Sequence, residues 1–143
     1  MTVLPLLTRI DHVGIACRDL DAAIGLYQAT FGLEVVSLEV NEEQGVREAM
    51  LALPDGPSYV QLLEPLAPDT PVGKFLARRG EGIHHVGYAV PDVVAALSEI
   101  GESGVRLIDK RPRHGSMGAS IAFLHPADLG GVLTELVQPR LAS

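Results

Sequence analysis

Two histidines stand at matching places in a segment that the chain carries twice. Residues 10–19 and residues 83–92 contain Ile, His, Val, Gly, Ala and Asp in the same order, and corresponding positions differ by 73 (85 − 12 and 92 − 19). Each copy sets its histidine, His12 or His85, within an apolar segment typical of a strand. One such histidine alone is usually a hydrogen-bonded core residue, but the duplication favours a metal ligand.

The two copies also end alike. Residues 60–65 (VQLLEP) match residues 134–139 (TELVQP) with an offset of 74 (135 − 61), which sets Gln61 against Glu135. Burying a carboxylate among apolar neighbours is costly unless something compensates it, and a divalent cation would. If the two halves pack about a pseudo-twofold axis, we expect four ligands around one ion: His12, Gln61, His85 and Glu135. This mixed nitrogen and oxygen set suits a first-row divalent ion with open positions better than a closed structural zinc site.

Glu48 is a candidate general base. A strand predicted at residues 46–53 would place Glu48 on one face between Val46 and Met50. A carboxylate on a half-exposed face could simply be solvated. Held in a cleft instead, it would have the raised pKa that a general base requires.

The composition indicates a globular protein. The chain has 143 residues, of which 47% are hydrophobic and 20% charged, enough for one domain or for two small halves sharing a core. The net charge of −7 argues against nucleic-acid binding. No apolar run reaches membrane-spanning length, residues 1–9 do not resemble a signal peptide, and the single Cys17 fits a core position in a reducing, cytoplasmic setting.

Each half is predicted to fold as strand, helix and three strands. The first half has strands at residues 9–17, 33–40, 46–53 and 58–63, with a helix that begins after Asp19, carries apolar residues at helical spacing as far as Phe31 and ends at Gly32. A linker follows, with a short helix from Pro71 to Gly80. The second half has a helix after Asp92, strands at residues 105–108, 119–124 and 132–137, and a flexible loop at residues 113–118. This plan predicts an α+β fold of two tandem βαβββ modules, at residues 9–66 and 83–139, joined by residues 67–82.

Basic residues gather in two places, at Lys74, Arg78 and Arg79 and at Lys110, Arg111 and Arg113. Either group could be a solvated face or could hold an anionic ligand. His84 would point to the face opposite His85, and His114 and His125 have no counterpart in the other half, so we expect loop positions for both.

The duplicated plan with its four paired residues resembles the vicinal oxygen chelate (glyoxalase) superfamily. Within it, residues 44–48 (QGVRE), 82–86 (GIHHV), 123–126 (FLHP) and 130–136 (GGVLTEL) look like the methylmalonyl-CoA epimerase family, and the resemblance covers residues 9–139. It implies one domain over residues 1–143, with a curved mixed sheet around a metal-binding cleft. It further implies an isomerase of propionate metabolism, forming a homodimer, that interconverts (2R)- and (2S)-methylmalonyl-CoA through a metal-stabilised enolate.

By this resemblance the four paired residues bind one divalent metal per chain, Co²⁺ in preference, with Mn²⁺, Ni²⁺, Zn²⁺ and Mg²⁺ open. Glu48 and Glu135 would be the acid-base pair, and Lys110, Arg111 or Arg113 would hold the phosphates of coenzyme A. A glyoxalase I-type lyase is the nearest rival, and an extradiol dioxygenase would have no need of Gln61. A metal-free small-molecule-binding protein of the same fold is the alternative from another class.

Overall fold

The structure, a computed structural model, describes residues 5–141. Residues 1–4 and 142–143 lie outside the described residues. The predictions for the domain limits 1–143 and for residues 1–9 therefore fall partly outside them. The chain forms two compact units. The first unit is His12–His84, and the second unit combines the described residues up to Asp11 with those from His85 on.

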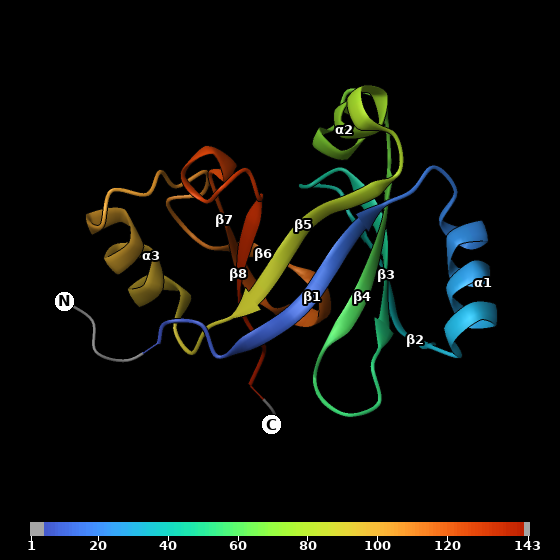
Figure 1. Ribbon diagram of the computed structural model, residues 1–143, viewed down its shortest axis with the longest axis horizontal. Helices are drawn as coiled ribbons and strands as arrows, with labels where there is room; N and C mark the ends of the chain where they lie inside the picture. The colour runs from blue at the N-terminus through green and yellow to red at the C-terminus, as the bar shows by residue number, and fades with distance from the viewer. Residues whose placement is uncertain (1–4, 142–143) are drawn as a thin grey trace. The chain divides into compact units, whose positions relative to one another are not determined.

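The first unit is a four-stranded sheet with two helices. Its elements are β1 (Arg9–Ala16, from His12 on), α1 (Leu20–Phe31), β2 (Glu34–Asn41), β3 (Val46–Ala52), β4 (Tyr59–Pro65) and α2 (Pro71–Arg79). The strand order is β2-β3-β4-β1, in which β2, β3 and β4 are antiparallel neighbours and β1 runs parallel to β4. Figure 1 shows α1 lying along this sheet, with α2 at the end of β4.

Local chemistry explains where α1 begins and ends. Asp19 accepts the backbone N–H of Ala22 at 3.0 Å, and Gly32 ends the helix with a φ of 69° that favours glycine. The helix buries Leu20 against apolar residues of the sheet, namely Ala49, Leu51 and Leu62. Phe31, the last apolar residue at this helical spacing, lies outside the core: its side chain is 66% exposed, whereas Ala23, Ile24 and Tyr27 pack against the sheet.

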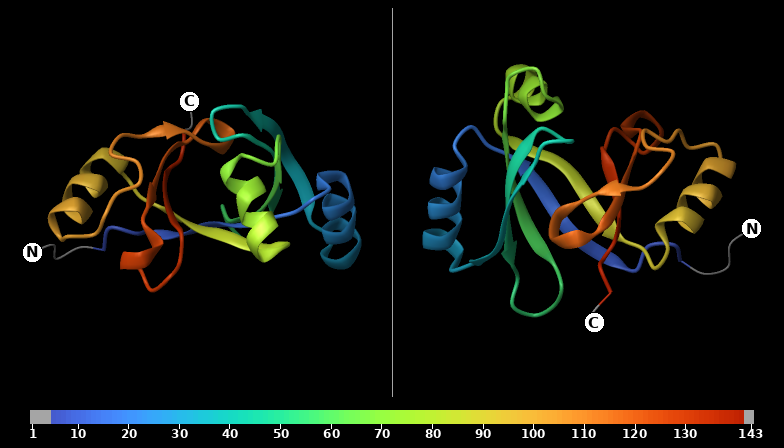
Figure 2. Two further views of the ribbon diagram at one scale, coloured as in Figure 1. Left: turned by 90° about the horizontal axis from the view of Figure 1, so that it is seen from above. Right: turned by 180° about the vertical axis from the view of Figure 1, so that it is seen from behind.

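The second unit repeats this plan. It contains β5 (Gly82–Ala89, from His85 on), α3 (Val93–Glu102), β6 (Arg113–His114), β7 (Ser120–Leu124) and β8 (Thr134–Gln138), with short 3-10 turns at Ser116–Gly118 and Pro126–Asp128. The strand order is β5-β8-β7-β6, and β5 runs parallel to β8. Figure 2 shows α3 beside these strands. Val93 and Leu97 of α3 pack with Leu124 and Leu136 of the strands in the core of this unit.

Matching registers confirm the duplicated βαβββ plan. Gly14 pairs with Gln61 between β1 and β4, and Gly87 pairs with Glu135 between β5 and β8. Asp92 caps α3 as Asp19 caps α1, accepting the N–H of Ala95 at 3.0 Å. The predicted linker helix is also confirmed, with Thr70 as its N-cap and Val72 and Leu76 buried.

The predicted strand at residues 105–108 is wrong. Only Leu107 forms a bridge there, to Leu124, and the N–H groups of Ile108 and Asp109 both donate to the carbonyl of Phe123. Two donors on one carbonyl break the alternation that a strand ladder requires. The missing strand is β6, which lies inside the stretch 113–118 predicted to be a flexible loop and which places His114 in a strand.

Among the described residues no helix has both the length and the apolar character needed to cross a membrane.

Candidate metal and acid-base site

His85 and Glu135 lie together in the second unit. His85 is on β5 and Glu135 on β8, and the pairing of Gly87 with Glu135 puts both side chains on one face of the sheet. The Nε2 atom of His85 is 3.5 Å from Oε1 of Glu135, and the two side chains are only 3% and 6% exposed. A carboxylate so buried needs a positive partner, either a protonated imidazole or a cation.

An aromatic ring completes this half of the site. Phe123 on β7 pairs with Glu135 across the strands, and its ring meets the imidazole of His85 edge to face, with centroids 5.4 Å apart and planes at 84°. Such a contact restricts the rotation of the imidazole.

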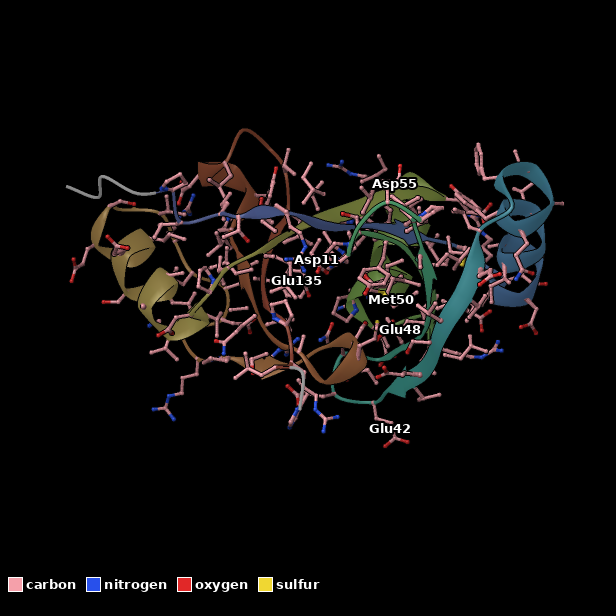
Figure 3. The ribbon with its side chains drawn as sticks, turned by 90° about the horizontal axis from the view of Figure 1, so that it is seen from below. Asp11, Glu42, Glu48, Met50, Asp55 and Glu135 are labelled. Atoms are coloured by element: carbon pink, nitrogen blue, oxygen red, sulfur yellow. The ribbon has the colours of Figure 1, made fainter. Side chains whose placement is uncertain are left out.

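The first unit carries the other candidates on one face of its own sheet. His12, Glu48 and Gln61 come from β1, β3 and β4, and the registers Gly14–Gln61 and Met50–Gln61 set all three on the same face. Each is at most 5% exposed. Figure 3 shows Glu48 and Met50 close together on β3, whereas Glu42 points away from them.

Gln61 and Glu48 are hydrogen-bonded. The Nε2 atom of Gln61 donates to Oε2 of Glu48 at 3.1 Å. An ionised carboxylate only accepts, so the amide must present its NH₂ group to Glu48 and turn its carbonyl oxygen, the atom that can bind a metal, the other way. The bond fixes the orientations of the candidate ligand Gln61 and of the candidate base Glu48 together.

The donor set fits a divalent cation. His12, His85 and Glu135 each offer one ligand atom for a metal ion, and all three are buried. Neutral imidazole, carboxylate and amide oxygen suit first-row divalent ions. The burial of two carboxylates, Glu48 and Glu135, supports the same assignment because their charge calls for a positive partner.

The three candidate cations for coenzyme A differ in their surroundings. Lys110 and Arg111 are exposed. Arg113 is 33% exposed, and its Nε lies 3.5 Å from Oδ1 of Asp109, which is 12% exposed. The register of Arg113 with Ile121, two residues before Phe123, places it on the same face as Glu135.

The remaining candidates have structural places. Cys17 is in the core as expected: burial, followed by the charges of Glu64, Glu81 and Asp19, raises its pKa to about 11. His84 packs edge to face on Phe75 of α2. His125 follows β7, and its Nδ1 accepts the N–H of Ala127.

Sequence reasoning missed two carboxylates and an amide. Asp11 is buried beside Arg9, with a 3.3 Å ion pair. Glu64 accepts the N–H of Leu20 at 2.6 Å, and Gln138 accepts the N–H of Val93 at 3.0 Å. The repeat does carry a signal for Glu64 and Gln138, because the two residues occupy the same place in the two copies.

Residues 11–123 match the Glyoxalase/Bleomycin resistance protein/Dioxygenase superfamily, and the chain belongs to it. A methylmalonyl-CoA epimerase in complex with methylmalonyl-CoA and NH4+ is 57% identical, with a TM-score of 0.91 over 93% of this chain and 95% of that chain. A variant of the Streptomyces coelicolor methylmalonyl-CoA epimerase, in complex with 2-nitronate-propionyl-CoA, is 55% identical, with a TM-score of 0.92 over 94% of this chain and 99% of that chain. The ethylmalonyl-CoA/methylmalonyl-CoA epimerase of Cereibacter sphaeroides is 38% identical over 91% of this chain and 97% of that protein.

Within the superfamily the chain therefore belongs to the methylmalonyl-CoA epimerases, a family of enzymes. The expected resemblance and the α+β fold class are confirmed.

Proposed function

We propose that this chain interconverts (2R)- and (2S)-methylmalonyl-CoA. The observation that carries the proposal is the pair of half-sites, in which an imidazole and a Gln or Glu oxygen occur at one register in both units. Relatives named methylmalonyl-CoA epimerase, at 55% and 57% identity, support this reaction over the lyase reaction of a glyoxalase I. A metal-free binding protein would have no use for buried, paired ligands.

The proposed metal ligands are His12, Gln61, His85 and Glu135, holding one divalent ion, with Co²⁺ the first candidate. A divalent ion there would supply Lewis-acid stabilisation of the negative charge that develops on the thioester oxygen.

Acid-base chemistry is assigned to two carboxylates. Epimerisation breaks the C–H bond between the thioester and the free carboxylate: the proton passes to Glu48, and the electron pair moves towards the thioester carbonyl. A proton returned to the opposite face of the same carbon inverts it. The group on that face must hold a proton before the reaction begins. Glu135, protonated on the oxygen that does not bind the metal, is the proposed donor, with a water or another side chain as the alternative. The hydrogen bond from Gln61 holds Glu48 in one orientation for this transfer.

The finer assignments follow from the same proposal. Lys110, Arg111 and Arg113 would meet the phosphates of coenzyme A, since they are cations of the second unit near its edge strand β6. A homodimer in the cytoplasm is proposed by resemblance, and the single cysteine fits a reducing compartment.

The test is exchange of the α-proton of methylmalonyl-CoA in D₂O, with and without chelator. We expect rapid exchange that chelation abolishes and that Glu48→Gln slows by about 100-fold or more, as the loss of a general base does. Glu42→Gln is the matched control, because Glu42 is exposed and points away from Glu48. Undiminished exchange in Glu48→Gln would remove Glu48 from the mechanism, and exchange that survives full chelation would remove the metal.

A further inference from the structure

Asp109 contacts both Phe123 and Arg113 in the second unit. Its Oδ2 accepts the backbone N–H of Phe123 at 2.9 Å, and its Oδ1 lies 3.5 Å from Nε of Arg113. At 12% exposure the carboxylate is largely withdrawn from water, which strengthens both contacts.

The backbone at Phe123 is held on both sides. Its N–H donates to the side chain of Asp109, and its carbonyl accepts the N–H groups of Ile108 and Asp109 at 3.0 and 3.1 Å. The ring that this backbone carries is the one that meets His85 edge to face. Asp109 is therefore connected to the imidazole of His85 through one intermediate residue, Phe123.

The other oxygen of Asp109 sets the direction of a cation. Arg113 shares a face of the sheet with Phe123 and Glu135, as the registers of β6, β7 and β8 show. The 3.5 Å approach of Nε to Asp109 is an ion pair and not a hydrogen bond. This attraction would restrict the long guanidinium side chain and orient its terminal N–H groups for an anion.

We propose that Asp109 is a positioning residue that aims both the candidate metal ligand His85, through Phe123, and the anion-holding Arg113. This inference rests on the proposed function, because it assumes that His85 binds a metal and that Arg113 meets an anionic part of the substrate. It adds that one carboxylate, which itself contacts neither the metal nor the anion, aligns His85 and Arg113.

Four substitutions separate the two parts of the proposal. The metal arm is the link from Asp109 through Phe123 to His85, and the anion arm is the contact of Asp109 with Arg113. Asp109→Asn keeps an oxygen for the Phe123 N–H but removes the charge facing Arg113, so it tests the anion arm alone. Phe123→Leu removes the ring and tests the metal arm alone. Asp109→Ala removes both contacts. Asp128→Ala is the matched control: Asp128 also binds a backbone N–H and an arginine of the second unit, those of Arg106, but it meets no candidate site residue.

The metal arm is read without catalysis, by titrating Co²⁺ into the purified protein and recording its visible absorption. We expect Phe123→Leu and Asp109→Ala to weaken Co²⁺ binding by about 10- to 100-fold and to change the spectrum, as losses behind a metal ligand do. Asp109→Asn and Asp128→Ala should bind Co²⁺ as the unaltered chain does.

The anion arm is read as KM against kcat. We expect Asp109→Asn to raise KM for methylmalonyl-CoA about tenfold, as the loss of one charge-assisted contact does, with kcat nearly unchanged. If the anion is a phosphate of coenzyme A, the effect disappears with the methylmalonyl thioester of N-acetylcysteamine; if it is the substrate carboxylate, the effect remains.

Asp109→Ala indistinguishable from Asp128→Ala in both Co²⁺ affinity and KM would overturn the inference. That result leaves the proposed function standing, because the unaltered chain would still bind metal and exchange the proton. Failure of the unaltered chain to do either would instead overturn the proposed function. Thermal unfolding of every variant, measured in parallel, identifies any that loses Co²⁺ only because it is unfolded.

Discussion

Gln61 and Glu135 occupy the same place in the two copies but differ in one side-chain atom: Gln61 has an amide nitrogen where Glu135 has a second carboxylate oxygen. An acid at position 61 would face Glu48 as a second carboxylate in a buried site, and two like charges there would not both remain ionised. The amide instead donates to Glu48 at 3.1 Å and still has an oxygen to offer a metal. This difference between the two copies would therefore let Glu48, the proposed base, remain ionised.

Burial makes the thiol of Cys17 a weak acid and a slow nucleophile. Its pKa is raised from 9.0 to about 11, first by burial, so at pH 8 the thiolate fraction is about 100-fold below that of an exposed thiol. We expect a thiol reagent at pH 8 to label the folded protein at least about 100-fold more slowly than the urea-unfolded chain. Equal labelling rates in the folded and unfolded states would contradict this prediction, because they would mean that the thiol of Cys17 is accessible and that its pKa is not raised by folding.

The sign of the pH effect follows from the same shift. The folded state holds the thiol proton more tightly than the unfolded chain does. The resulting stabilisation is complete below about pH 9 and is lost as the pH rises through about 11. Denaturant unfolding of the unaltered chain and of Cys17→Ser across this window should therefore converge at high pH.

At the scale of the elements, the two N-caps offer a comparison within one molecule. Asp19 and Asp92 both accept an N–H three residues on, at 3.0 Å in each case. We expect Asp19→Ala and Asp92→Ala each to lower the free energy of unfolding by about 1 kcal/mol, measured by urea denaturation. Asp55→Ala, in the exposed turn after β3, is the control and should change it by less than about 0.5 kcal/mol. If only one of the two substitutions lowers the free energy of unfolding, the two caps differ in their contribution to stability although their geometry is the same.

Elements were predictable where periodicity and capping agreed. Asp19, Gly32, Thr70 and Asp92 mark helix ends that a sequence pattern can recognise. Residues 105–108 have the composition of a strand but form only one bridge, because the N–H of Arg106 donates to Asp128 and the N–H groups of Ile108 and Asp109 share the carbonyl of Phe123. These partners lie between 14 (123 − 109) and 22 (128 − 106) residues along the chain, beyond what a local pattern can report.

For the molecule as a whole, most of the candidate site could be predicted because the chain is duplicated. It identified His12, Gln61, His85 and Glu135 by comparing one half with the other, and the strand registers of both units put the paired residues at equivalent places. Residues of the second unit without a counterpart in the first escaped this comparison. Phe123 and Asp109 contribute through an edge-to-face ring contact and a backbone hydrogen bond, neither of which has a spacing that the sequence displays.

The proposed metal makes a prediction about how the molecule unfolds. Two of the proposed ligands, His12 and Gln61, belong to the first unit, and two, His85 and Glu135, to the second. A metal that needs ligands from both is lost when either unit unfolds, so it stabilises both at once. At a free metal concentration 100 times its Kd, the stabilisation amounts to about 2.7 kcal/mol.

We therefore expect Co²⁺ to raise the midpoint of thermal unfolding and to produce a single transition by calorimetry. His12→Ala and His85→Ala should each abolish the rise, although the two residues lie in different units. His114→Ala, at an exposed position of β6, is the control and should retain it. A full rise in His12→Ala would show that the second unit binds the metal by itself, and the shared site would then have to be abandoned.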